Sequence, residues 1–156
     1  MRFEHIQALT GAVGVSLGRS RSVLIDQARI DGFAEVTEDR QWIHVDPQRA
    51  GSGPYGVTIA HGYLTLSLMS VFLEDLFDVA NVDSRINYGL GRVRFPAPVA
   101  VNSTVSATGE ILAVREAPDS TQVDLRMVVE SATGDRPVCV ADLIVLLRPS
   151  RAQASA

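Results

Sequence analysis

Residues 59–78 decide the fold, and they read IAHGYLTLSLMSVFLEDLFD. From Gly62 to Asp78 the apolar residues surround the whole helical wheel instead of one face. The small polar residues among them, such as Thr65 and Ser67, can hydrogen-bond back to the helix carbonyls. A helix that is apolar on all sides is buried by its neighbours. The sequence therefore predicts a helix over 62–78 that the rest of the domain encloses.

The C-terminal half is typical of β-strands, because its apolar residues alternate with period two. Val123 and Leu125 point one way, and Gln122 and Asp124 point the other. Residues 136–147 are nearly all apolar, as expected for a central strand covered on both faces. We expect strands near 85–95, 103–114, 121–131 and 136–147. An enclosed helix followed by an antiparallel meander predicts an α+β domain whose sheet is wrapped around that helix.

The N-terminal half is expected to hold a short strand over 20–25, one helix and a long loop. Asp26 can cap a helix that runs to about Thr37, with one apolar face that includes Ile30 and Ala34. The loop over 38–60 is long for a compact domain, and such loops are usually functional. A single domain is predicted over 1–148, with 149–156 as a loose C-terminal tail.

Length and composition are those of an ordinary globular domain. The chain has 156 residues, of which 46% are apolar and 21% charged, so neither disorder nor a fibrous structure is expected. The longest solidly apolar run, Leu143–Leu147, is far shorter than the ~20 residues that a membrane span needs. The N-terminus has no apolar core of a signal peptide. We therefore expect a cytoplasmic protein that does not enter membranes.

The composition also excludes several chemistries. No lysine is present, which rules out a Schiff-base enzyme and a Walker-type phosphate loop. Cys139 is the single cysteine, so no internal disulfide or thiolate zinc cluster can form. A net charge of −4 gives no overall attraction to nucleic acid. Carboxylates and three histidines (His5, His44 and His61) are left for acid–base work.

Asp39 and His44 form the first candidate site. They are five residues apart at the exit of the predicted helix, in a loop that can turn both side chains toward one pocket. A carboxylate and an imidazole that face one water molecule can polarise it and move its protons. The alternative interpretation is a surface helix end that happens to be followed by a histidine.

Asp46, which lies close to this pair in the sequence, has a structural explanation of its own. Asp46 precedes Pro47, which is typical of an N-cap with proline at the first helical position. A metal site built from His44, Asp46 and His61 is a further alternative. No fixed ligand spacing supports it, so no metal is predicted.

Gly62, at the start of the enclosed helix, is the second candidate. The first N–H groups of a helix lack internal partners, and glycine lets a substrate oxygen approach the backbone, so an oxyanion hole can form there. The alternative is that Gly62 only permits tight packing between helix and sheet. We interpret the preceding His61 as a hydrogen-bonded core histidine.

Two blocks of sequence resemble the MaoC-like dehydratases, which include the (R)-specific enoyl-CoA hydratases of the hot-dog fold. The first block runs from Phe33 through Asp39, His44 and Pro47 to Ala50, and the second is 59–68, IAHGYLTLSL. Residues 41–44, QWIH, and 86–99, INYGLGRVRFPAPV, look like the nodulation-protein-N-like branch of the family. The resemblance covers about residues 26–147.

The resemblance implies a hot-dog fold, which is an antiparallel sheet curled around a central helix, and a homodimer whose sheets join edge to edge. It implies that Asp39 and His44 are the catalytic pair and that the Gly62 amide binds a thioester oxygen. Some hydratases also use a serine nine positions after the histidine of the His-Gly pair, and here that position is Ser70. One departure is Gln41-Trp42, where the commoner hydratase motif has Asn-Pro.

The implied activity is reversible syn hydration of a trans-2-enoyl-CoA to the (R)-3-hydroxyacyl-CoA by water held between Asp39 and His44. No metal or redox cofactor is expected, and coenzyme A or an acyl carrier is part of the substrate. One alternative is an acyl-CoA thioesterase of the same fold. Another is a non-catalytic protein that binds acyl thioesters. Sequence alone leaves open which of the two residues accepts the proton of water, and which acyl chain length is preferred.

Overall fold

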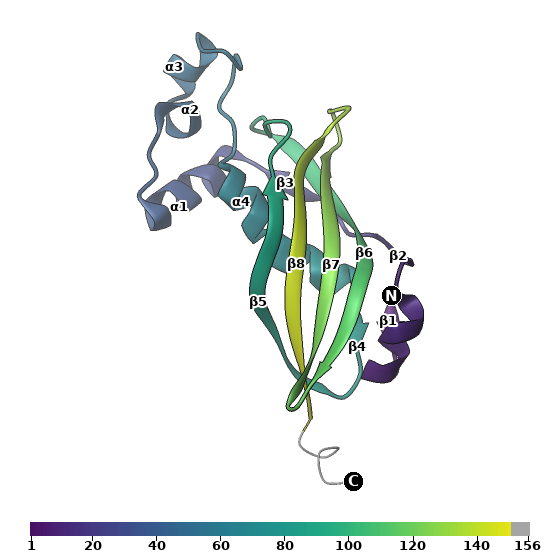
Figure 1. Ribbon diagram of the computed structural model, residues 1–156. Coiled ribbons are helices and arrows are strands. Elements are labelled where there is room, and N and C mark those ends of the chain that lie inside the picture. Colours follow the sequence, from purple (N-terminus) through teal and green to yellow (C-terminus); the bar gives the residue numbers. More distant parts are fainter. Residues whose placement is uncertain (151–156) are drawn as a thin grey trace.

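A curved antiparallel sheet covers a long broken helix in this chain, of which a computed structural model describes residues 1–150 (Figure 1). The helices are η1 (Ile6–Ala12, a 3-10 helix), α1 (Gln27–Thr37), α2 (Trp42–Val45), α3 (Pro47–Gly51), α4 (Gly62–Ser67) and α5 (Met69–Leu76). The strands are β1 (Arg2–Phe3), β2 (Ser16–Arg19), β3 (Val23–Ile25), β4 (Asp78–Val79), β5 (Val82–Arg94), β6 (Ser103–Ala117), β7 (Ser120–Ser131) and β8 (Pro137–Pro149).

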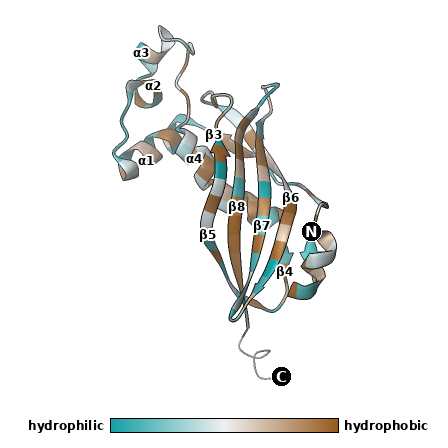
Figure 2. Cartoon of the chain, viewed as in Figure 1, coloured by the Kyte–Doolittle hydropathy of each residue, from teal (hydrophilic) through white to brown (hydrophobic). Residues whose placement is uncertain are grey.

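The large sheet has the strand order β2-β6-β7-β8-β5, and β3 also pairs with β6. β8 lies between β7 and β5, as its nearly continuous apolar sequence predicts. The inward residues Val123 and Leu125 of β7 pair with Val145 and Leu143 of β8, and all except Leu143 are fully buried. Figure 2 shows the resulting mixture of apolar and polar residues along the strands. β5 remains an edge strand, because it pairs only with β8.

The enclosed helix is present, but it ends earlier than predicted and has a break at Leu68. The Leu68 amide donates to the Leu64 carbonyl at 3.2 Å, and Phe72 donates to Leu68 at 3.0 Å, so α5 continues from α4. The helix ends at Leu76 and not at Asp78. Asp78 instead begins β4, which pairs in parallel with β1 at the N-terminus. Strand pairing therefore overrides the helical pattern of the last two residues.

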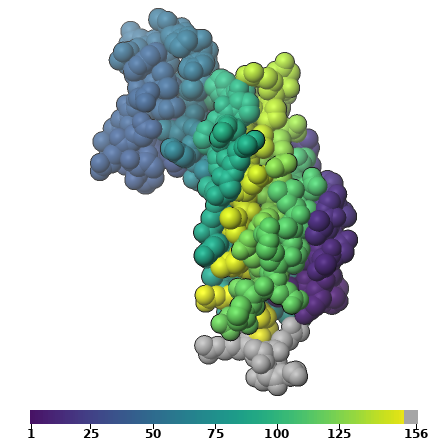
Figure 3. All heavy atoms as spheres, in the orientation of Figure 1, coloured from purple at the N-terminus to yellow at the C-terminus, as the bar shows by residue number. Residues whose placement is uncertain are grey.

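The predicted first helix is confirmed, with the Asp26 side chain accepting a hydrogen bond from the Arg29 amide at 2.9 Å. Its Ile30 and Ala34 are buried, whereas Thr37 is exposed. The predicted loop over 38–60 contains two short helices, α2 and α3. Together, residues 27–60 form an arm that projects beyond one end of the sheet (Figures 1 and 3).

Two smaller predictions need correction. Of the strand expected over 20–25, only Val23–Ile25 is a strand. The Ser20 amide instead donates a hydrogen bond to the Ala107 carbonyl of β6, and the Ser20 hydroxyl accepts one from the Ala107 amide. Pro149 was assigned to the tail, but it pairs with Val82, and the Ser150 amide donates to the Asn81 carbonyl at 2.9 Å. The rest of that tail, 151–156, lies outside the described residues. No helix within 1–150 is long and apolar enough to cross a membrane.

Candidate active site

The arm brings Asp39 and His44 together. Glu38, at the C-terminal end of α1, has a left-handed backbone with φ of 62°, which ends the helix and starts the turn that carries Asp39. His44 lies in α2. One Asp39 carboxylate oxygen and one ring nitrogen of His44 are within 4.8 Å of each other. Two hydrogen bonds of about 2.8 Å that meet at one water molecule span such a gap. The carboxylate is exposed and the imidazole is buried, with 7% of His44 accessible.

A single contact fixes the tautomer of His44. Its Nδ1 lies 2.6 Å from the backbone carbonyl of Ile59, and a carbonyl only accepts hydrogen bonds. Nδ1 therefore carries a proton, and Nε2 of the neutral ring has a free lone pair. The arm supplies this contact itself, since the Ile59 amide also donates to the Ile43 carbonyl at 3.0 Å.

Burial lowers the pKa of His44 below its ordinary value of 6.5, because the charged ring is poorly solvated there. The hydrogen bond to the Ile59 carbonyl opposes this effect and raises the pKa. The neighbouring His61 lowers it, and the charge of Asp39 raises it. The net result is a neutral imidazole near pH 7, which is the form that accepts a proton.

His61 is a buried, hydrogen-bonded histidine, as the sequence interpretation expected, with 2% of the residue accessible. Its Nε2 lies 2.9 Å from the backbone carbonyl of Asp39. Its ring stacks on that of His44, with ring centroids 3.8 Å apart and planes inclined by 25°. The sequence did not predict this contact with both members of the pair.

Gly62 begins α4, and no side chain caps that helix end. The His61 carbonyl accepts from the Leu64 and Thr65 amides, whereas the Gly62 amide precedes the first intrahelical bond. A Cβ at Gly62 would lie 3.1 Å from the ring of Phe95. The packing interpretation of this glycine is therefore supported. This packing is compatible with a Gly62 backbone amide that is available to a ligand.

His44 and Gly62 line one cavity of about 390 Å³. The cavity is bounded by Tyr55 of the arm, by Thr65 of α4 and by the segment that follows β5. The other lining residues are Ile59, Ala60, Phe95, Pro96, Ala97, Pro98, Val99 and Val138. The walls combine apolar side chains with the polar side chains of His44, Tyr55 and Thr65 and with the start of α4. Such a cavity suits a substrate that carries both apolar and polar groups.

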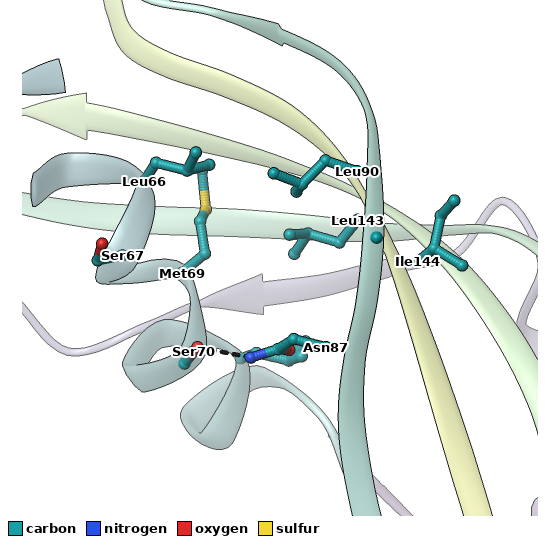
Figure 4. A pocket seen from close by; sticks show the side chains of 10 residues that line it. Leu66, Ser67, Met69, Ser70, Asn87, Leu90, Leu143 and Ile144 are labelled. Atoms are coloured by element: carbon teal, nitrogen blue, oxygen red, sulfur yellow. Dashed lines mark hydrogen bonds between the residues drawn. The ribbon is translucent and has the colours of Figure 1, made fainter. Parts of the chain in front are cut away.

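Ser70 lies elsewhere. It lines a second cavity, of about 320 Å³, between the helix and the sheet (Figure 4). There the Ser70 hydroxyl accepts a hydrogen bond from Asn87 Nδ2 at 3.0 Å. Apolar side chains form most of the wall, including Leu66, Met69 and Leu90. Within one chain Ser70 is therefore not among the residues that line the His44 cavity. Sequence reasoning missed Asn87, whose only signal was a polar residue in the 86–99 motif.

The three residues Asp39, His44 and His61 each offer a possible metal ligand, all within 4.8 Å. The two imidazoles, however, are stacked at 25°. The nitrogen lone pairs lie in the ring planes, so they run side by side and would meet at a cation only after a ring rotated. Asp46, which belonged to the alternative metal set, instead caps α3 by accepting from the Arg49 amide at 3.0 Å.

Trp42, the departure from the commoner motif, packs inside the arm. The Arg49 guanidinium lies 4.5 Å from the centre of a Trp42 ring. A Cβ at Gly53 would lie 2.9 Å from the same side chain, so the loop after α3 needs glycine there. Trp42 thus joins α2, α3 and the following loop, and it does not line the His44 cavity.

This chain matches a known protein family over most of its length. The model of the MaoC like domain family matches residues 8–133. The 3-hydroxyacyl-thioester dehydratase Z of Mycobacterium tuberculosis H37Rv is 44% identical over 144 residues, 92% of this chain and 95% of that protein. Nodulation protein N of Rhizobium leguminosarum bv. viciae is 37% identical over 139 residues, 87% of this chain and 86% of that protein.

A solved structure is similar over most of the fold. The (R)-hydratase from A. caviae involved in PHA biosynthesis superposes with a TM-score of 0.71 at 28% identity, and the match covers 85% of this chain and 94% of that one. This similarity confirms the α+β hot-dog fold predicted from the sequence.

Proposed function

Because this chain belongs to the MaoC-like dehydratase family and is a hydro-lyase, we propose that it reversibly hydrates a trans-2-enoyl-CoA to the (R)-3-hydroxyacyl-CoA. One observation carries the proposal: a carboxylate oxygen of Asp39 and a ring nitrogen of His44 lie within 4.8 Å of each other, and the hydrogen bond from Nδ1 to Ile59 leaves the Nε2 lone pair of the neutral ring free. The relative from M. tuberculosis is itself named a thioester dehydratase. Neither a metal nor a redox cofactor enters the proposed reaction.

In the proposed reaction, water lies between Asp39 and His44 Nε2. Its oxygen forms a bond to C3 of the enoyl thioester, and one of its protons passes to the pair. The pair returns one proton to C2 on the same face, so the double bond is consumed and no other reactant is needed. The neutral, Nδ1-protonated state favours His44 as the acceptor of the water proton, with Asp39 orienting the water.

Charge builds up on the thioester oxygen while C3 is attacked. We propose that the Gly62 amide donates a hydrogen bond to this oxygen, since Gly62 and His44 line the same cavity. A fixed donor aimed at developing charge stabilises the transition state more than the ground state. The phenyl ring of Phe95 packs against Gly62 in the same cavity.

The direct test is a spectrophotometric assay of enoyl-CoA hydration, with chiral analysis of the product. Loss of the enoyl absorbance of crotonyl-CoA together with formation of (R)-3-hydroxybutyryl-CoA supports the proposal. Release of free thiol without that loss would identify the thioesterase alternative instead. Tight binding of acyl-CoA of every chain length, with no turnover, would point to a binding protein.

The pH profile of this activity is the first prediction. His44 must be neutral to accept a proton, and its pKa is lowered by burial. We therefore expect kcat/KM to be level near pH 7 and to fall as the pH drops, with the midpoint of the fall below 6.5. Measuring kcat/KM with crotonyl-CoA from pH 5 to 8 checks this. A midpoint above 6.5 would contradict the assignment of His44 as the base.

We further propose that the Ser70 cavity receives the acyl chain. Gly62, Leu66 and Ser70 are spaced by four residues and so share one face of the helix. Eight residues of helix span about 12 Å, so a chain that leaves the thioester at Gly62 along this face arrives at Ser70. The apolar wall suits methylene groups, and the Ser70–Asn87 pair supplies the polar part of the lining.

Filling this cavity is the second prediction. In Leu66→Trp the larger side chain excludes several methylenes, each worth about 0.8 kcal/mol of transfer free energy. We expect the ratio of kcat/KM for C12 to that for C4 enoyl-CoA to fall at least ~10-fold. Leu66→Met, which conserves volume, is the matched control and should keep the ratio. An equal loss on both chain lengths would place the acyl chain elsewhere.

A second copy of the chain is the proposed occupant of the free sheet edge. β5 is 13 residues long, and its Tyr88 and Leu90 are 65% and 45% exposed. Long edge strands with exposed apolar side chains are usually covered, because they otherwise pair with other chains. We propose a homodimer joined along β5, as the family resemblance implies.

A further inference from the structure

His61 contacts both members of the proposed catalytic pair, yet the reaction uses neither of its nitrogens. Nε2 lies 2.9 Å from the Asp39 carbonyl, and the ring stacks on His44 with ring centroids 3.8 Å apart. The ring of Phe33 lies 5.1 Å from it, between centroids. Only 2% of the residue is accessible. Complete burial in contact with both Asp39 and His44 indicates that His61 has a role beyond packing.

We propose that His61 is a positioning residue, which anchors the backbone of Asp39 beside His44 through Nε2 and holds the His44 ring in place by stacking on it. The proposal rests on the proposed function for its kinetic consequences. Its structural consequences, the tautomers of the two rings, do not depend on any activity.

The anchoring follows from the position of Asp39. The residue lies in the short segment between α1 and α2, next to the left-handed Glu38, and its side chain makes no hydrogen bond or ion pair within the described residues. The bond from His61 Nε2 to the Asp39 carbonyl joins this segment to the start of α4, 22 residues away in the sequence. His61 thus ties together the carboxylate, the imidazole and the Gly62 amide.

The tautomer of His61 follows from the same contacts. Because a carbonyl only accepts, Nε2 of His61 donates to the Asp39 carbonyl, and this bond requires a proton on Nε2. Nδ1 is buried and has no partner within residues 1–150. The Nε2 contact is therefore the one hydrogen bond that the His61 side chain makes in the described part of the chain.

Titratable groups lie near His44 on several elements, and Asp31 of α1 is linked to the His44 backbone carbonyl through Gln27. Asp39 faces it from the segment before α2, and His61 faces it from the start of α4. Tyr55, from the loop after α3, is the one other titratable residue that lines the same cavity. The carboxylate favours the imidazolium and the second ring disfavours it, while burial adds to the effect of the ring. Asp39 and His61 thus act on the pKa of His44 in opposite directions.

The first arm of the test uses nuclear magnetic resonance of ¹⁵N-labelled histidine in the full chain. The chain has only three histidines, and His5→Gln, at the exposed N-terminal end, identifies the third signal. We expect opposite tautomers, Nδ1–H for His44 and Nε2–H for His61. The same tautomer for both rings would overturn the proposal.

The second arm compares two variants that separate the two contacts. His61→Phe keeps an aromatic ring against His44 but loses the donor, whereas His61→Gln keeps a donor near the Nε2 position but loses the ring. We expect His61→Phe to lower kcat for crotonyl-CoA by ~10–100-fold with KM changed little, since small displacements of a catalytic group have effects of this size. His61→Gln should recover at least about half of that loss on a logarithmic scale, because the anchor is restored.

The outcomes separate this inference from the proposed function. Wild-type kcat in both variants, measured per folded protein, would overturn the anchoring role. If His61→Phe does not fold, His61→Gln and the tautomers in the wild type still decide the question. If the wild type does not hydrate any enoyl-CoA, the proposed function fails, while the tautomers still test the contact between His61 and Asp39.

Discussion

Replacing Asp39 with asparagine should lower kcat for crotonyl-CoA at least ~100-fold while leaving the fold intact. The amide keeps the size and shape of the carboxylate but neither carries its charge nor moves its proton. The Asp39 backbone carbonyl still accepts from His61 Nε2, so the site keeps its geometry. The water would lose the partner that orients it toward C3, and His44 would act alone.

The Asp39→Asn substitution should change activity without changing stability. The Asp39 side chain is exposed and has no hydrogen bond or ion pair in the described part of the chain, so removing its charge breaks no structural contact. Exposed substitutions of this kind change stability by about 0.5 kcal/mol or less, so the Tm should move by no more than about 2 °C. Circular dichroism melts beside the hydration assay measure both quantities.

Glu38→Gln is the matched control. It removes one negative charge from the neighbouring residue, in the same exposed turn, without touching the proposed pair. Its activity should stay within about twofold of wild type, which is the range expected from a change in surface charge alone. If Asp39→Asn were as active as Glu38→Gln, Asp39 would have no part in the chemistry. The fold and the family would be unaffected by that result.

Sequence reasoning predicted local features well and distant contacts poorly. The cluster of polar residues at a helix end made Asp39 and His44 a candidate site, the family resemblance gave the pair its catalytic role, and the Asp46–Pro47 pair predicted the cap of α3. The contacts that orient these groups join residues far apart in the chain. His44 contacts Ile59, 15 residues away, and no periodicity carries that information.

The errors have the same origin. The helical pattern of residues 62–78 continues through Phe77 and Asp78, but the N-terminal strand β1 competes for these residues and pairs with Asp78. Local preference is a weak guide wherever a distant segment offers hydrogen bonds. Ser70 illustrates the same limit, because its position in the motif fixes its helix face and says nothing about Asn87, its partner on β5.

His44 provides the second large effect, and two variants are needed to interpret it. His44→Ala and His44→Asn should each lower kcat for crotonyl-CoA at least ~100-fold, because neither offers a basic nitrogen to the water. Their stabilities should differ. Alanine leaves a cavity and an unpaired Ile59 carbonyl, which costs about 1–3 kcal/mol. The asparagine amide can donate to that carbonyl, so His44→Asn should melt at a higher temperature than His44→Ala.

Equal loss of kcat in two variants of unequal stability would separate the chemistry of His44 from its packing. If His44→Asn instead kept wild-type turnover, the buried imidazole would be structural, and Asp39 would have to act alone. Activity that followed the Tm of each variant would point the same way. Either result would remove the base from the proposed reaction.

The double variant Asp39→Asn/His44→Asn then tests whether the two residues act as a unit. Groups that handle one water molecule together give losses that do not add, because the first substitution already removes most of the shared function. We therefore expect the double variant to lose about as much kcat as the more damaging single variant. Losses that multiply would mean that Asp39 and His44 stabilise the transition state independently. In that case, a water molecule shared by Asp39 and His44, whose polar atoms lie within 4.8 Å of each other, would not be the centre of the mechanism.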